Sequence, residues 1–267
     1  MPLFESLREF AKSHVSEFEW EMTKDAAKFL IGAAAGCTLK VTRDRWRTRR
    51  ARAFWHPFLS DDVRLVIGRF GQVRHFDLLK FERSGVLGVG DAIALAELQR
   101  YFSQIGGSPQ LAYADRLEGD ALKHTMILLG GPDANSVTRR TAKRITSMLR
   151  FGSAEVNEIA IRDTSEASPR LYVPSPLDQD NAGTDYGLIL RAPNPFAPDK
   201  EIMIIAGSFG HGTWAAARHV TSIEFLAKSA SLQPGPMECL VETDVELDTP
   251  QSIRQVLLRN FVQKIEA

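Results

Sequence analysis

The sequence predicts an α/β fold in which a mixed, mostly parallel sheet is flanked by helices, behind a helical extension at the N-terminus. Three apolar runs carry this prediction, Val63–Ile67, Thr125–Leu129 and Ile202–Ala206, because glycines and then a helix-like segment follow each of them. If these strands are parallel, right-handed crossovers bring the three turns to the carboxyl edge of one sheet. That edge is where open α/β folds bind their ligands.

The N-terminal region has a helical composition and several interpretations. Residues 3–20 have the spacing of an amphipathic helix, which favours packing on the fold or on a second subunit. In the following segment, 26–41, the uncharged run Phe29–Leu39 is shorter than the ~20 residues of a spanning helix. Arginines and tryptophans follow it. We consider a buried or oligomer-forming helix, a membrane-associated segment with arginines on its cytoplasmic side, and nucleic-acid contact by the arginines.

A composition change near Pro57 predicts two parts. Residues 1–56 form a helical region for assembly or membrane association, and residues 57–267 form the α/β domain. The membrane alternative involves residues 26–55, and the assembly alternative predicts a homo-oligomer.

Charge and cysteine content indicate which partners and which cellular compartment to expect for this protein. The chain has 33 basic and 33 acidic residues, so overall charge predicts no nucleic-acid partner. Cys37 and Cys239 form no disulfide or zinc pattern, which favours a reducing compartment. The first residues lack a secretory signal. We therefore expect a cytoplasmic protein, with association at the inner face of the membrane as the alternative, and no particular cofactor or metal is indicated.

The first glycine turn contains Gly88, Gly90 and Asp91 and leads into a predicted helix over residues 92–105, which stops at Gly106. Asp91 is placed as the N-cap of this helix. The alternative is that the three residues line a ligand site, with the Asp91 carboxylate accepting a hydrogen bond from a ribose hydroxyl or a base.

The second turn follows the strand Thr125–Leu129 and contains Gly130, Gly131, Asp133 and Asn135, before a predicted helix over residues 136–149. Asn135 either caps this helix or holds a base or a phosphate-bearing ribose. Residues 110–113 predict a further short strand.

The third turn lies in the segment 201–220, EIMIIAGSFGHGTWAAARHV, around which the prediction is organised. The free N–H groups and the dipole of a helix start favour a phosphate or carboxylate. A tight turn also needs glycine when nothing binds, and His211 is either a turn residue or a base. The candidate ligand-binding residues here are Gly207, Gly210, His211, Gly212 and Thr213.

The remaining strands make the predicted sheet mixed. Residues 159–161 predict a strand, residues 165–183 a long loop, and residues 185–191 a strand. The last of these is joined to Ile202–Ala206 by a short proline turn, so the two are expected to be antiparallel neighbours. Residues 236–247 predict a late strand whose acidic face indicates a sheet edge. Residues 248–265 predict a final helix with Thr249 as its cap and Pro250 at its first position.

Common catalytic signatures are missing from the sequence, which has no HExxH, GxSxG, Walker or zinc-cysteine motif. Two carboxylates that converge in a cleft can serve hydrolysis of an N-glycosidic bond. Asp91 and Asp133 are the candidate catalytic pair.

Gly210-His211-Gly212-Thr213 after a strand, with Gly130-Gly131 after an earlier strand, resembles the paired glycine motifs of the SLOG superfamily, which includes the Lonely Guy phosphoribohydrolases. The family form is PGGxGTxxE, and Ser208, Phe209 and Ala216 replace its Pro, first Gly and Glu. The segments DYGLILRAPNPF and AGSFGHGT are also similar to uncharacterised prokaryotic proteins.

The resemblance implies a Rossmann-like fold and phosphate binding, while the missing glutamate argues against phosphoribohydrolase activity. We therefore expect a sensor or effector domain that binds a nucleotide or a nucleotide derivative. The alternatives are a hydrolase that cleaves an N-glycosidic bond of a nucleotide or NAD, and a non-catalytic interaction protein whose glycines only make turns.

Overall fold

The computed structural model describes residues 48–60, 62–69, 72–73, 76–77, 85–152, 159–175 and 182–263. The helices expected over residues 3–20 and 26–41 lie outside these residues. Contacts divide the chain after Arg49, and the compact unit that begins at Arg50 contains the sheet. Trp55, which precedes the expected boundary near Pro57, is completely buried in the core of this unit.

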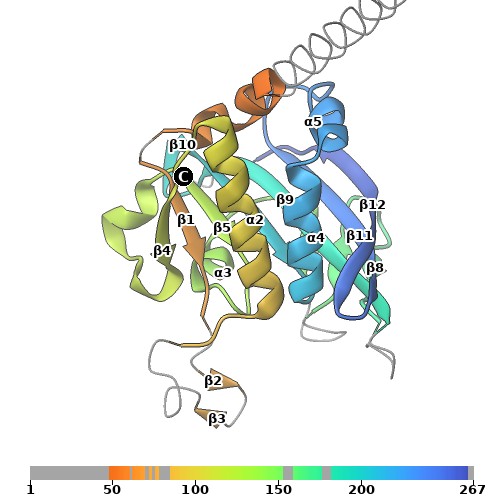
Figure 1. Ribbon diagram of the computed structural model, residues 1–267. Helices are drawn as coiled ribbons and strands as arrows, with labels where there is room; N and C mark the ends of the chain where they lie inside the picture. Colours follow the sequence, from red (N-terminus) through yellow and green to blue (C-terminus); the bar gives the residue numbers. More distant parts are fainter. Residues whose placement is uncertain are drawn as a thin grey trace, which may run out of the picture. The chain divides into compact units, whose positions relative to one another are not determined.

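A mixed sheet of seven strands forms the centre of the unit (Figure 1), in the order β12-β11-β9-β10-β5-β1-β4. The neighbours β10, β5, β1 and β4 are parallel, and β9, β11 and β12 continue the sheet in antiparallel pairs. The strands are β1 (Arg64–Ile67), β4 (Gln110–Tyr113), β5 (Met126–Leu129), β9 (Gly183–Asn194), β10 (Ala197–Gly207), β11 (Met237–Glu246) and β12 (Thr249–Asn260). The predicted antiparallel pairing of the strands on either side of the proline turn is confirmed by β9 and β10.

Helices and a smaller sheet cover the two faces. In Figure 1, α2 and α4 lie side by side in front of the sheet and α3 lies behind it. The helices are α2 (Val89–Ile105), α3 (Ser136–Ala142), α4 (Gly210–Val220) and α5 (Ile223–Ser229), with short turns η1 (His56–Phe58), η3 (Ala114–Arg116) and η4 (Gly119–Lys123). A three-stranded antiparallel sheet contains β6 (Leu149–Phe151), β7 (Ile161–Asp163) and β8 (Arg170–Tyr172), and β2 (Gln72–Val73) pairs with β3 (Phe76–Asp77).

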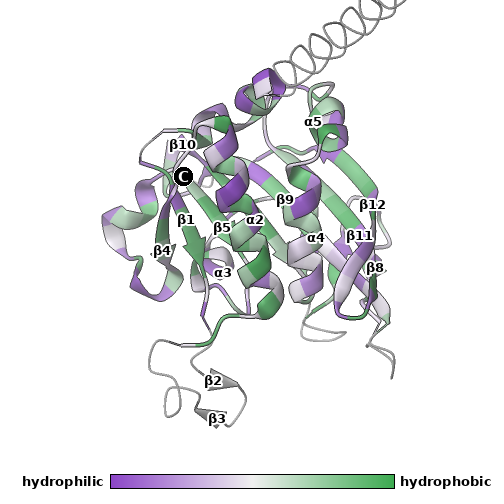
Figure 2. Ribbon diagram, viewed as in Figure 1, coloured by the Kyte–Doolittle hydropathy of each residue, from purple (hydrophilic) through white to green (hydrophobic). Residues whose placement is uncertain are grey.

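The central strands are buried on both faces, which explains why they read as continuous apolar runs. Ile127, Met203 and Ile205 pack in the cluster with α2 and α4, whereas Leu128 and Ile204 pack on the opposite face with α3. Figure 2 shows these strands as hydrophobic along most of their length.

The last segment is a strand, so the predicted helix over residues 248–265 is wrong. Leu247 and Asp248 have positive φ angles of 49° and 56°, which makes the tight turn of a hairpin between β11 and β12. Thr249 and Pro250 therefore start an edge strand instead of a helix. The strand predicted over residues 236–247 is confirmed as β11, but its predicted position at a sheet edge is wrong, because β11 lies between β9 and β12.

Two other segments differ from the expectation, one in the length of its helix and one in containing a strand. The helix expected over residues 136–149 ends at Ala142, and Leu149 already belongs to β6. The segment expected as a loop over residues 165–183 contains the short strand β8. Among the helices of the described part, none is long and apolar enough to cross a membrane.

Candidate functional site

The three glycine turns meet at the carboxyl edge of the parallel strands, where α2 and α4 begin. β5 ends directly before Gly130, and β10 ends at Gly207. A Cβ atom added at Gly90 would overlap the backbone of Gly210, and one added at Gly131 would lie 3.4 Å from the oxygen of Gly207. The turns are therefore neighbours in space, although about 120 residues separate the first from the third.

Close packing accounts for most of these glycines. An added Cβ would overlap the oxygen of Tyr186 at Gly212 and the amide nitrogen of Thr213 at Gly207. Gly90 and Gly210 similarly let α2 and α4 approach each other. The interpretation of these glycines as residues of tight turns therefore explains them without a ligand.

Asp91 lies at the centre of the converging turns. It is at the third position of α2, whose N-cap is Gly88, so the prediction that Asp91 caps the helix is wrong. Its Oδ2 atom would lie 3.6 Å from a Cβ added at Gly88 and 3.4 Å from one added at Gly130, which has a φ of +97°. The Thr213 hydroxyl of α4 hydrogen-bonds the carboxylate. Two turns and two helices thus enclose one acidic group.

Burial changes the acidity of this carboxyl group. Asp91 is 7% exposed, and desolvation raises its pKa from 3.8 to about 6. The hydrogen bond from Thr213 opposes this increase, and the negative charge of Asp133 adds to it. A carboxyl group that titrates near neutral pH is suited to proton transfer.

Asn135 and Asp133 lie in the turn after β5 but differ in role. Asn135 is completely buried, and its Oδ1 accepts hydrogen bonds from the N–H groups of Val137 (3.0 Å) and Thr138 (3.1 Å). Its Nδ2 donates to the carbonyl oxygens of Val66 and Leu129. Asn135 is therefore the cap of α3 and joins it to two strands, with no capacity left for a ligand. Asp133 is exposed.

Asp185 is a residue of this edge that sequence reasoning missed. Its carboxylate is 2% exposed and accepts hydrogen bonds from the N–H groups of Gly212 (2.6 Å), Tyr186 (2.7 Å) and Phe209 (3.2 Å). Burial raises its pKa, and the three hydrogen bonds act in the opposite direction. Asp185 thus occupies the N-terminus of α4, where a phosphate was expected to bind. No local signal reveals this contact, because it spans 27 residues.

A groove of about 700 Å³ lies beside these turns. Its lining is mostly apolar and includes Val89 and Ile93 of α2, Phe209 before α4, and Trp214. Phe209 is 46% exposed, and His211 Nε2 lies 3.2 Å from the carbonyl oxygen of Asp248. Of the predicted site residues, Gly88, Gly90, Gly210 and His211 line the groove. The other predicted site residues are not part of its lining: Asp91, Gly130, Gly131, Asp133, Asn135, Gly207, Gly212 and Thr213.

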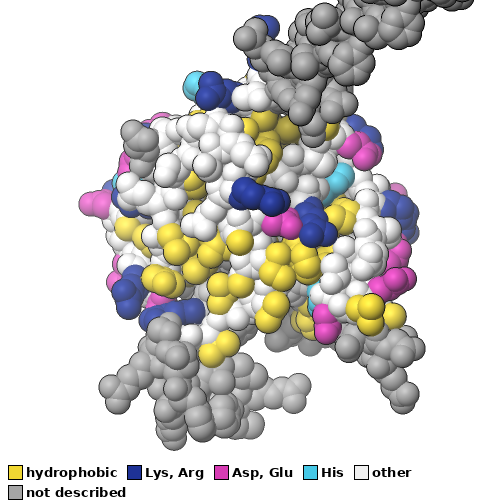
Figure 3. Space-filling model, in the orientation of Figure 1, with side chains coloured by type: hydrophobic (Ala, Val, Ile, Leu, Met, Phe, Trp, Pro, Cys, Tyr) yellow, Lys and Arg dark blue, Asp and Glu magenta, His cyan; other side chains and the backbone are white. Residues whose placement is uncertain are grey.

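The helix face beside the groove is partly hydrophobic. Figure 3 shows hydrophobic side chains gathered over the side formed by α2 and α4, with basic and acidic side chains between them. An ion pair of 3.0 Å between Arg218 and Glu97 joins the two helices, and the Trp214 indole also donates to Glu97. These contacts join the middle of α2 to α4.

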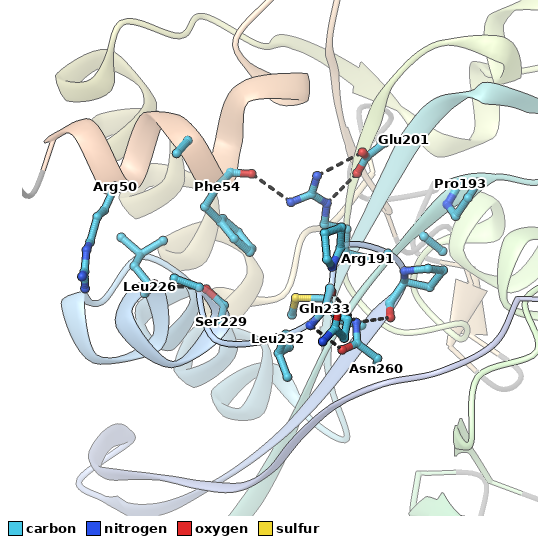
Figure 4. A pocket seen from close by; sticks show the side chains of 17 residues that line it. Arg50, Phe54, Arg191, Pro193, Glu201, Leu226, Ser229, Leu232, Gln233 and Asn260 are labelled. Atoms are coloured by element: carbon cyan, nitrogen blue, oxygen red, sulfur yellow. Dashed lines mark hydrogen bonds and ion pairs between the residues drawn. The ribbon is translucent and has the colours of Figure 1, made fainter.

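A second cavity, of about 490 Å³, is lined by Arg50, Phe54, Arg191 and Glu201 among others (Figure 4). The Arg191 guanidinium donates to both carboxylate oxygens of Glu201 at 2.5 and 3.0 Å and to the carbonyl oxygen of Phe54. It also stacks on the rings of Phe54 and Phe58. Because Arg191 is fully engaged with protein groups, we interpret this cluster as structural.

Comparison with known proteins adds no assignment: no family model matches the chain, and no curated protein is similar to it.

Proposed function

We propose that the α/β domain is Rossmann-like and binds a nucleotide or a nucleotide-derived molecule through its nucleoside part, in the groove beside α2 and α4. The observation that carries the proposal is the position of this groove, at the carboxyl end of β10 and at the start of both helices. Ligands of open α/β folds bind at this position. The volume of about 700 Å³ is also within the usual range for small-molecule sites.

The chemistry of the lining favours a nucleoside over a bare phosphate. Phe209 offers an exposed ring on which a base can stack, next to the apolar side chains of Val89 and Ile93. Ribose hydroxyls can bond to the polar groups of the lining, such as His211 and Thr184. The Asp185 carboxylate at the start of α4 repels a phosphate there. Phosphates of a bound nucleotide would therefore point away from α4.

The resemblance to the SLOG superfamily is part of this proposal, and it favours binding of a nucleotide without turnover. Ala216, at the position of the family glutamate, is completely buried and packs near Gly187 of β9. A glutamate at this position would enter the core instead of the groove. Binding without turnover, as in a sensor or effector, therefore fits these residues better than phosphoribohydrolase activity.

The test is thermal unfolding of the full chain with adenosine, AMP, ATP, cyclic AMP, NAD and ADP-ribose. At about a hundredfold over the dissociation constant, a ligand adds roughly 2.7 kcal/mol to stability. We expect Phe209→Ala to abolish the shift and Ile223→Ala, which removes a similar exposed side chain outside the groove, to retain it. If no compound shifts the transition, or if Phe209→Ala leaves the shift unchanged, the nucleoside proposal fails and the interaction-protein alternative takes its place.

A hydrolase is the second candidate, and the pKa of about 6 at Asp91 favours it. In that reaction water adds to C1′ of the ribose, the C1′–N bond breaks, and the leaving base takes up the proton that Asp91 donates. The proton that the water loses returns to the Asp91 carboxylate, which restores the acid. Asp91 is not among the residues that line the groove, so the hydrolase is the second candidate. Release of adenine or nicotinamide from AMP or NAD, lost in both Asp91→Asn and Asp133→Asn, would establish it. Binding without release of a base would leave the sensor proposal.

A further inference from the structure

A separate cavity of about 280 Å³ lies on the opposite face of the large sheet, where α3 is packed. Its floor is apolar and contains Ile145, Leu149, Leu188, Leu190 and Ile204. Leu149 belongs to the small sheet, whereas Leu188 and Ile204 belong to β9 and β10. The cavity is therefore lined by α3, the small sheet and two strands of the large sheet, and it shares no lining residue with the groove at α2 and α4.

Four basic side chains line this cavity, and among the lining residues that the structure describes there is no carboxylate. They are Arg139, Lys143, Arg150 and Arg162. Across the described residues, none of the four forms an ion pair; Arg139 and Arg150 bond only to backbone carbonyl oxygens. Within the described part of the chain, the positive charge around the apolar floor is therefore not neutralised by an ion pair.

Two of these basic residues are paired on adjacent strands of the small sheet. Arg150 of β6 and Arg162 of β7 are direct partners in the antiparallel register. Like charges in directly opposite positions destabilise a strand pair. An anion between the two guanidinium groups would turn this repulsion into attraction.

Two buried polar atoms of the lining lack a partner within the part of the chain that the structure describes. Thr138 is completely buried, and its hydroxyl has no hydrogen-bond partner there. The Nε atom of Arg162 is also buried without one. Unsatisfied buried donors are costly, and both of these can donate to a ligand oxygen.

We propose that this cavity binds a small organic anion, in which an oxyanion group on an apolar body is held by Arg162, Arg150 and the Thr138 hydroxyl. The apolar body lies against the leucine and isoleucine floor. Carboxylates and phosphate monoesters share this chemistry, and guanidinium groups bind both. The site is independent of the proposed nucleoside site, because the two cavities share no lining residue.

The test is isothermal titration calorimetry of the full chain with octanoate, octyl phosphate and, as the uncharged control, octanol. We expect at least one of the two anions to bind and octanol to bind at least about tenfold more weakly, since charge-assisted hydrogen bonds are lost. The tighter anion identifies the headgroup. Octanol binding as tightly as both anions, or no binding of either anion, would overturn the proposal.

Matched variants assign the binding to this cavity. Arg162→Gln should weaken the anion about tenfold, whereas Arg170→Gln, in the neighbouring strand β8 and outside the lining, should leave affinity unchanged. Thr138→Val should weaken binding without lowering the melting temperature of the free protein, because the hydroxyl it removes has no partner. Equal affinity of Arg162→Gln and the native chain would place the ligand elsewhere and refute the assignment.

Discussion

Replacing Asp91 with asparagine keeps the shape of the side chain and removes a carboxylate that the fold holds 7% exposed. The amide oxygen can still accept the hydrogen bond from Thr213, so the main change is the loss of a buried charge. Because burial raises the pKa of Asp91, the charged form costs the folded state free energy. The substitution should therefore stabilise the protein at neutral and alkaline pH.

The size of the effect follows from the two pKa values. The difference between 3.8 and about 6 corresponds to about 3 kcal/mol, at 1.36 kcal/mol for each pKa unit. Since the folded-state pKa is raised, the stabilisation from the protonated form is complete below pH 3.8 and is lost as pH rises through about 6. The advantage of Asp91→Asn should thus be near zero at pH 3.8 and below and reach about 3 kcal/mol at pH 8.

Urea unfolding of the full chain at pH values from below 3.8 to 8 measures this difference directly. Asp199→Asn is the matched control, because the Asp199 side chain is 75% exposed and a surface change there should stay within about 0.5 kcal/mol. If Asp91→Asn is less stable than the native chain at pH 8, or if its advantage does not change with pH, desolvation does not control this group. A confirmed gain would mean that the native chain keeps Asp91 at a cost in stability, which is typical of functional residues.

Three further substitutions test the packing around the site and the small sheet, each by urea unfolding at pH 7. Glu238→Ala should lower the free energy of unfolding by about 3–5 kcal/mol, because this completely buried carboxylate accepts hydrogen bonds from Arg259, the Ser147 hydroxyl and two backbone N–H groups. A decrease below about 1 kcal/mol would contradict this. Asn135→Ala should lower the free energy of unfolding by at least about 2 kcal/mol, because α3 loses its cap and the carbonyl groups of Val66 and Leu129 lose a donor. An unchanged urea midpoint would argue against the capping role of Asn135. Gly212→Ala should cost about 1–3 kcal/mol or more, since its Cβ overlaps the Tyr186 oxygen, and a neutral result would mean that α4 can shift.

The central strands could be predicted because their signal is local. A strand buried on both faces needs a continuous apolar run, and Thr125–Leu129 and Ile202–Ala206 are such runs. The antiparallel pairing of β9 and β10 also followed from the chain, because the connection is too short for a crossover. The carboxyl-edge position of the turns is a consequence of these parallel strands.

The last strand could not be predicted from local patterns. Thr249-Pro250 is typical of a helix start, yet the positive φ angles of Leu247 and Asp248 make a hairpin turn there. These residues are not the glycine or asparagine that usually marks such a turn. Pairing with β11 over the length of β12 outweighs the local preference.

The sequence by itself determined the strand–turn–helix units, because each depends on residues that are neighbours in the chain. Only the tertiary structure decided the partners of the polar groups: Asp185 on the start of α4, Thr213 on Asp91, and Arg162 opposite Arg150 beside Thr138. The physical reason is that burial and hydrogen bonding depend on distance in space. The pKa of Asp91 and the gathering of basic side chains around the cavity beside α3 are set by groups far away in the sequence.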